Sequence, residues 1–194
     1  MTLDVERYHR LIETGILLDG EPFELLDGHL VRKDRSSAGE DAMTVGHGHA
    51  WVIGQLSDLT LRLRHLRCYM QVQLPVTLPP LHEPEPDGAI VVGSNDDYRD
   101  RHPVAADLTC VMEVADGSLQ HDRTTKLRIY AAAAIPMYLI VNLVDRVIEV
   151  YTEPMGKGRS ARYGRQETLS GRQKLLLPAR RGRWLRVPVA NLLP

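Results

Sequence analysis

A glutamate lies inside one of the most apolar segments of the chain, the run from Leu108 to Val114. The length and composition of this run predict a buried strand. Burying a carboxylate costs several kcal/mol unless a partner neutralises it. A fold that buries this segment therefore has to place a cation or hydrogen-bond donors beside Glu113.

Two further residues are candidates to lie near Glu113. Asp87 stands at the start of a second short apolar run, Ala89–Val92, which also predicts a buried strand. Lys126 lies one turn into a predicted helix whose N-cap is Asp122. Side chains on neighbouring strands lie about 5 Å apart. Asp87 and Glu113 can therefore share one divalent ion if their strands are adjacent.

Two carboxylates and a main-chain carbonyl suit Mg²⁺, which prefers oxygen ligands and keeps several waters. Such an ion polarises a phosphodiester and lowers the pKa of a bound water. Lys126 would add positive charge beside the developing transition state. The residues alone leave another interpretation open, because acids at strand ends are common and Lys126 can form an i,i+4 ion pair with Asp122.

The rest of the chain predicts an α/β domain with an N-terminal helix and hairpin. Apolar residues at helical spacing predict helices over residues 3–17 and 46–65. Asp27-Gly28 between two short apolar runs predicts a β-hairpin over residues 22–31, and residues 32–44 predict a mobile loop. Further strands are predicted at 68–76, 137–142, 146–151, 161–169 and 174–177, followed by a docked segment at 184–193.

Two polar side chains on these elements are candidates for the same site. Glu24 lies in the first strand of the hairpin, where an exposed strand glutamate is the ordinary interpretation. His49 lies near the start of the second helix, on the same side as Val52, and can reach a central cleft. His47 and His49 can instead form a metal pair, although nothing nearby completes a zinc site.

The composition is that of an ordinary globular protein, with 43% apolar and 25% charged residues. A length of 194 residues fits a single domain over residues 1–194. No apolar run approaches the roughly 20 residues that cross a bilayer, and the acidic N-terminus lacks the apolar block of a signal peptide. We therefore expect a cytoplasmic protein. Cys68 and Cys110 do not have the spacing of a metal or redox site.

The net charge of −1 hides a strong asymmetry. From Met155 onward the chain has ten Lys and Arg residues against one acid, whereas the first 154 residues have fourteen against twenty-four acids. A basic segment on an acidic body can hold a polyanion near an acidic metal site. The alternative is that the basic residues are simply solvated strand and turn residues, among them Arg159, Arg162, Arg165 and Arg172.

The order of these residues resembles the Uma-two family, which is assigned to the restriction-endonuclease-like, PD-(D/E)XK superfamily. The resemblance covers roughly Leu3 to Tyr151, and the ordered series is far more specific than any one piece. The matching pieces are Glu24 before Asp27-Gly28, a histidine that opens a long helix, Glu85-Pro86-Asp87, Glu113-Val114-Ala115-Asp116-Gly117-Ser118 with Lys126 and Tyr130, and the exit segment from Ile135 to Asn142.

This resemblance implies a restriction-endonuclease-like core, in which helices flank a mixed central β-sheet. Pro86-Asp87 corresponds to the PD pair of the superfamily motif, and Glu113 corresponds to the acid of the next strand. The lysine that normally follows this acid by two residues is absent, since Ala115 stands there. In the similar family a lysine on the following helix takes its place, and Lys126 matches that position.

Glu24 and the helix histidine match additional polar positions of the same cleft. His49 fits the histidine position better than His47, because its spacing to the apolar helix face is regular. The family pattern has a second serine-like residue where Gly117 stands, and an acidic-Tyr-Trp sequence where residues 137–139 read Met-Tyr-Leu. We interpret both departures as packing changes.

The residues and the resemblance together predict a metal-dependent endonuclease that hydrolyses phosphodiester bonds in DNA. Asp87 and Glu113 would bind Mg²⁺, or Mn²⁺ in its place, Lys126 would stabilise charge and position water, and Glu24 and His49 would assist. One alternative is a weakly active or inactive nuclease-fold protein that binds nucleic acid or a protein partner. Another is an assembly subunit in which the polar cleft is a relic. By analogy with nucleases that cut two strands, we expect a homodimer.

Overall fold

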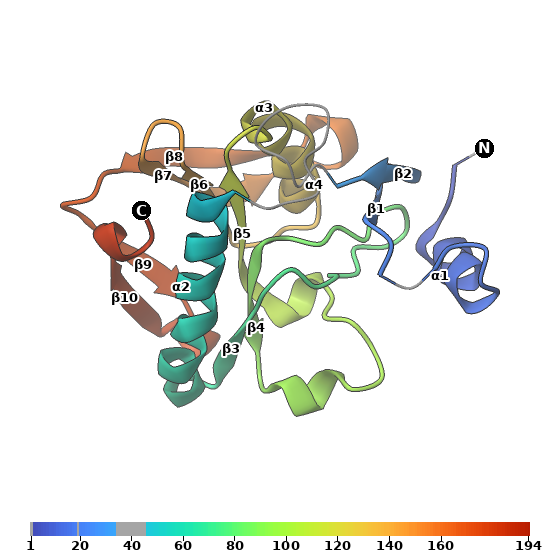
Figure 1. Ribbon diagram of the computed structural model, residues 1–194, viewed down its shortest axis with the longest axis horizontal. Helices are drawn as coiled ribbons and strands as arrows, with labels where there is room; N and C mark the ends of the chain where they lie inside the picture. The colour runs from blue at the N-terminus through green and yellow to red at the C-terminus, as the bar shows by residue number, and fades with distance from the viewer. Residues whose placement is uncertain (1, 19, 34–45) are drawn as a thin grey trace.

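A mixed six-stranded sheet forms the centre of the computed structural model, which describes residues 2–18, 20–33 and 46–194 (Figure 1). All neighbouring strands are antiparallel except β5 and β6, which are parallel. This is the mixed central sheet that the family resemblance implies. In spatial order the strands are β3 (Cys68–Gln71), β4 (Gly88–Val92), β5 (Leu108–Ala115), β6 (Met137–Asn142), β7 (Val147–Met155) and β8 (Arg162–Leu169).

Other elements cover both faces of the sheet. On one face, α2 (His47–Leu63) and the hairpin of β9 (Lys174–Pro178) and β10 (Trp184–Pro188) share one apolar core. On the other face lies the helix that starts as α3 (Leu119–His121) and ends as α4 (Leu127–Ala132). Alternate residues of the central strands face the two cores. The central strands β4, β5 and β6 are therefore buried on both sides.

The N-terminal segment consists of α1 (Val5–Glu13) and the hairpin of β1 (Phe23–Leu26) and β2 (His29–Arg32). The hairpin turn forms at Asp27-Gly28, as predicted, and both residues have positive φ angles, 52° and 74°. The hairpin docks on the connector that leads to β4, because Leu25 and Glu83 exchange two main-chain hydrogen bonds of 3.3 and 2.8 Å. This pairing brings β1 alongside the start of β4.

Some predicted boundaries are wrong for identifiable reasons. The first helix ends at Glu13 because Gly15 takes a φ of 70°, so the predicted extension to residue 17 does not form. Strand β3 stops at Gln71, and the predicted continuation to residue 76 is broken where Gln73 adopts a φ of 51°. Most of the predicted loop 32–44 lies outside the described residues. The predicted docked segment 184–193 contains strand β10, which pairs with β9.

The predicted role of Asp122 as an N-cap is also wrong. The helix begins earlier, at Leu119, with Ser118 before it. Asp122 lies inside the helix, where the chain widens into a five-residue π-helical turn, Asp122–Lys126. Single π turns inside helices are frequent at functional sites.

Both cysteines, Cys68 and Cys110, are buried free thiols. Among the residues that the structure describes, no helix combines the length and apolar character needed to cross a membrane.

Candidate active site

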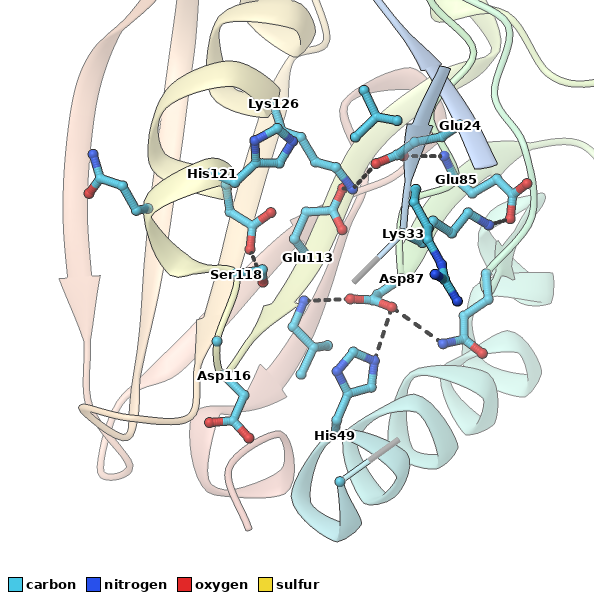
Figure 2. Close-up of a pocket in the computed structure, with 18 of the residues that line it drawn as sticks. Glu24, Lys33, His49, Glu85, Asp87, Glu113, Asp116, Ser118, His121 and Lys126 are labelled. Carbon is cyan, nitrogen blue, oxygen red and sulfur yellow. Dashed lines mark hydrogen bonds and ion pairs between the residues drawn. The ribbon is translucent and has the colours of Figure 1, made fainter. Parts of the chain in front are cut away.

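A cleft of about 590 Å³ lies at the end of the sheet where β4 begins and β5 ends (Figure 2). Its walls come from the β1–β2 hairpin, the start of α2, the two strand ends and the helix that contains the π turn. All five residues that the sequence proposes for a site line this one cleft: Glu24, His49, Asp87, Glu113 and Lys126.

The pairing of β4 with β5 brings the two predicted metal ligands together. Gly88 lies opposite Met112 in this antiparallel pair. One step further along each strand, the register sets Asp87 beside Glu113. The main-chain N–H of Val114 donates a 2.8 Å hydrogen bond to Asp87 Oδ2, which fixes that carboxylate against the end of β5. Neighbouring strands thus supply two acids at one point, as the sequence predicts.

His49 reaches Asp87 from the first turn of α2. Its Nε2 lies 3.1 Å from Asp87 Oδ1, and the amide of Gln73 donates to the same oxygen at 3.4 Å. Burial alone would raise the pKa of Asp87, but the contact with His49 lowers it below the ordinary value. The same contact raises the pKa of His49 against the opposing effect of burial. His47, the alternative histidine, is exposed at the start of α2 and does not line the cleft.

Glu113 receives the partner that its burial requires. Lys126 Nζ lies 3.0 Å from Glu113 Oε1, and the Tyr130 hydroxyl donates to the same oxygen at 2.7 Å. Burial raises the pKa of Glu113 to about 8, and the Lys126 ammonium offsets only part of that effect. Within the described residues, no hydrogen bond reaches the second oxygen, Oε2.

Lys126 lies among several acids. Its Nζ is 3.4 Å from Glu24 Oε1, while Glu24 Oε2 accepts a 3.2 Å hydrogen bond from the Glu85 main-chain N–H. Burial alone would lower the pKa of Lys126, but Glu113, Glu24 and Asp122 together raise it above its ordinary value. The lysine is therefore a charged, buried ammonium held between the hairpin and β5.

Asp122 is the acid that the sequence interpretation missed. Its side chain is buried in the cleft wall, and its Oδ2 accepts a 2.6 Å hydrogen bond from the Ser118 hydroxyl. Burial raises the pKa of Asp122, with Lys126 opposing the shift. The spacing of four residues between Asp122 and Lys126 was visible in the sequence, and it does place both on one helix face.

The sequence interpretation assigned no role in the site to several other cleft residues. Gln73 reaches Asp87 from a turn that was predicted as strand. Lys33 and Glu85 form an ion pair at the hairpin side of the cleft. His121 Nε2 is buried without a hydrogen-bond partner within the part of the chain that the structure describes. Asp116 lies at the cleft edge, directly after β5.

The donor set of the cleft is compatible with a hard divalent cation. Within residues 2–18, 20–33 and 46–194, no group of three or more His, Cys, Asp or Glu side chains is placed so that it could hold a metal ion. Mg²⁺ does not need such a group, since it usually binds one or two carboxylates and retains waters. Asp87 and Glu113 supply two carboxylates from adjacent strands, and Glu113 Oε2 remains without a hydrogen bond from any described residue.

Comparisons with known proteins bear on the family and the fold of the chain. The model of the Uma2 family, described as "Putative restriction endonuclease", matches residues 5–188. A crystal structure of "a putative nuclease belonging to DUF820 from Anabaena variabilis ATCC 29413" is similar, with a TM-score of 0.65 and 15% sequence identity. This similarity covers 94% of the present chain and 96% of the other, and it shows a shared nuclease fold. None of the curated proteins matches the chain. The family match spans most of the sequence, and the chain therefore belongs to the Uma2 family.

Proposed function

We propose that this protein is a metal-dependent endonuclease that hydrolyses phosphodiester bonds in DNA. Its family and its fold support nuclease chemistry. The observation that carries the proposal is the β4–β5 register, which sets Asp87 beside Glu113, together with the 3.0 Å contact between Glu113 and Lys126. This combination of two adjacent acids and a buried ammonium suits a divalent ion and a phosphate.

Asp87 and Glu113 would hold Mg²⁺ or Mn²⁺. When bound, such an ion polarises the phosphodiester and lowers the pKa of a bound water. Tyr130 and Lys126 fix Glu113 through Oε1. His49 and Gln73 orient Asp87 through Oδ1. The two carboxylates are thereby held in position before any ion arrives.

Lys126 would place its ammonium beside the phosphate oxygens, where negative charge develops in the transition state. Glu24 assists by holding Nζ from the side opposite Glu113. Asp122 lies one helical turn before the lysine and adds to the charge that keeps it protonated. The homodimer and the cytoplasmic location that the sequence suggests stay predictions.

The test compares cleavage of supercoiled plasmid and of single-stranded DNA in Mg²⁺, Mn²⁺ or EDTA. We expect cutting in either metal and none in EDTA. Glu113→Gln should lower the rate by about 10²-fold or more, the scale on which loss of one preorganised electrostatic group acts. The matched control is Glu83→Gln, an equally buried glutamate whose carboxylate bonds His9 and Thr77, each at 2.7 Å.

Unchanged cleavage in Glu113→Gln would contradict the assignment of the site. Salt-dependent DNA binding without cutting in any metal would contradict the enzymatic proposal and favour a nuclease-fold protein that only binds. Equal losses in Glu113→Gln and Glu83→Gln would mean that the assay reports folding and not chemistry.

A further inference from the structure

Seven arginines gather at the end of α2 that lies away from the cleft. Three come from the last turn of α2 and the turn that follows it, and four come from the tip of the β9–β10 hairpin and from β10. We call them the arginine patch: Arg62, Arg64, Arg67, Arg180, Arg181, Arg183 and Arg186.

Direct contacts join the two parts of the arginine patch. The Arg62 guanidinium donates a 2.6 Å hydrogen bond to the main-chain carbonyl of Arg186. The Cys68 thiol, which directly follows Arg67, lies within hydrogen-bond reach of the Arg180 main chain. Buried residues of α2 and β10 share one apolar core. Segments more than a hundred positions apart in sequence therefore form one surface.

The patch has no acidic counterpart. Six of its members are exposed, and Arg180 is partly buried. None of the seven forms an ion pair with a carboxylate among the described residues. The sequence supplies no acid between Asp58 and Glu83 and none after Glu167. The patch is thus a region of unneutralised positive charge.

One acidic turn approaches the patch through its main chain. The N–H of Gly93 donates to the Arg67 carbonyl at 2.9 Å. The acids that follow, Asp96 and Asp97, accept hydrogen bonds from residues of their own turn. They leave the guanidinium groups of the patch available to an external anion.

We propose that the arginine patch binds the phosphate backbone of DNA, as a second contact remote from the cleft. The choice of DNA among polyanions rests on the proposed function. Guanidinium groups match phosphate oxygens with paired hydrogen bonds, which makes arginine well suited to backbone contacts. His49 and Arg62 lie at opposite ends of α2, about 20 Å apart at 1.5 Å per residue. That distance corresponds to about six base pairs.

The test replaces three patch residues that have exposed side chains and no side-chain hydrogen bond within the described chain, in the variant Arg64→Gln/Arg183→Gln/Arg186→Gln. The control is the variant Arg159→Gln/Arg162→Gln/Arg172→Gln, which removes the same number of positive charges. Its three exposed positions lie before, in and after β8, and β8 is the edge strand opposite β3 in the sheet. Binding of a 30-base-pair duplex is measured by fluorescence anisotropy in EDTA, from 50 to 200 mM salt. EDTA makes binding independent of metal and prevents cutting.

We expect the patch variant to bind more than about tenfold more weakly at 100 mM salt. The slope of the logarithm of the DNA-binding constant against the logarithm of the salt concentration should become shallower by about 2.7. Each lost phosphate contact accounts for about 0.9 of this change, and three arginines are replaced. The control should bind like the unmodified protein. If the triple variant unfolds at a lower temperature, Arg183→Gln alone should still make the slope shallower by about 0.9.

Equal slopes for the patch variant, the control and the unmodified protein would overturn the proposal. The proposal would also be overturned if the patch were needed for binding to phosphatidylserine vesicles and the protein did not bind DNA. Plasmid cleavage is scored separately: patch-dependent DNA binding without metal-dependent cutting would support the patch and reject the nuclease. Metal-dependent cutting together with DNA binding that does not depend on the patch would support the nuclease and reject the patch.

Discussion

The central interaction of this protein is the contact between Glu113 and Lys126. A carboxylate inside an apolar strand demands a cation nearby, and this requirement could be inferred from the sequence. The role of Asp122 could not be inferred in the same way. The local sequence around an aspartate near a helix start is the same whether the residue caps the helix or lines a cleft. The contact of Gln73 with Asp87 could not be predicted from the sequence. It depends on a positive φ of 51° at Gln73, which is uncommon for residues other than glycine.

Replacing the lysine tests this interaction through folding. In Lys126→Met the acids Glu24, Glu113 and Asp122 lose the cation between them. We expect a loss of roughly 3–5 kcal/mol in the free energy of unfolding at pH 9 without metal, where the Glu113 carboxyl is ionised, because this is the usual cost of removing one partner of a buried ion pair. Urea denaturation measures it. A change below about 0.5 kcal/mol would show that the ammonium does not hold the cleft together.

The helix that contains Lys126 owes its position to a second buried carboxylate. Arg123, in the π turn, donates to Glu149 of β7 with hydrogen bonds of 3.1 and 2.6 Å. The hydroxyl of Tyr151 and the amide of Asn142 also donate hydrogen bonds to the Glu149 carboxylate, at 2.6 and 3.0 Å. The sequence predicts the helix and β7 separately, but nothing in it indicates which residue of the strand binds the helix. Long-range side-chain pairs of this kind follow from tertiary packing.

The pH dependence of stability tests this attachment. Burial would raise the pKa of Glu149, but Arg123, Tyr151 and Asn142 outweigh it and lower the pKa below the ordinary value of 4.5. The ionised carboxylate therefore adds stability above pH 4.5, and this contribution disappears as the pH falls through the lower folded value.

We expect Glu149→Gln to be less stable than the unmodified protein by a constant amount between pH 7 and 5.5. The difference in unfolding free energy should shrink between pH 4.5 and 3. Urea titrations at pH 7, 5.5, 4 and 3 measure it, with Glu167→Gln, an exposed glutamate on β8, as the control. A difference that stays constant down to pH 3 would contradict the lowered pKa.

In the whole molecule, two charged regions lie at opposite ends of α2: the acidic cleft at its start and the arginine patch at its end. The order of strands and helices from Leu3 to Tyr151 could be predicted, because apolar runs and turn residues alternate clearly there. The arrangement of the basic C-terminal part could not, because exposed residues make up much of its strands and do not indicate which neighbour each strand pairs with. The sequence suggested a basic segment near the metal site. The structure instead brings four of its arginines to the far end of α2.

The decisive measurement is calorimetric titration of the unmodified protein and of Asp87→Asn with MnCl₂ at pH 8, with Glu83→Gln as the control. If Asp87 and Glu113 together hold the ion, the unmodified protein and Glu83→Gln bind one Mn²⁺ per chain and Asp87→Asn loses that site. Because burial raises the pKa of Glu113 to about 8, binding should also weaken as the pH is lowered to 7. Equal Mn²⁺ binding by Asp87→Asn, or none by the unmodified protein, would contradict the metal site.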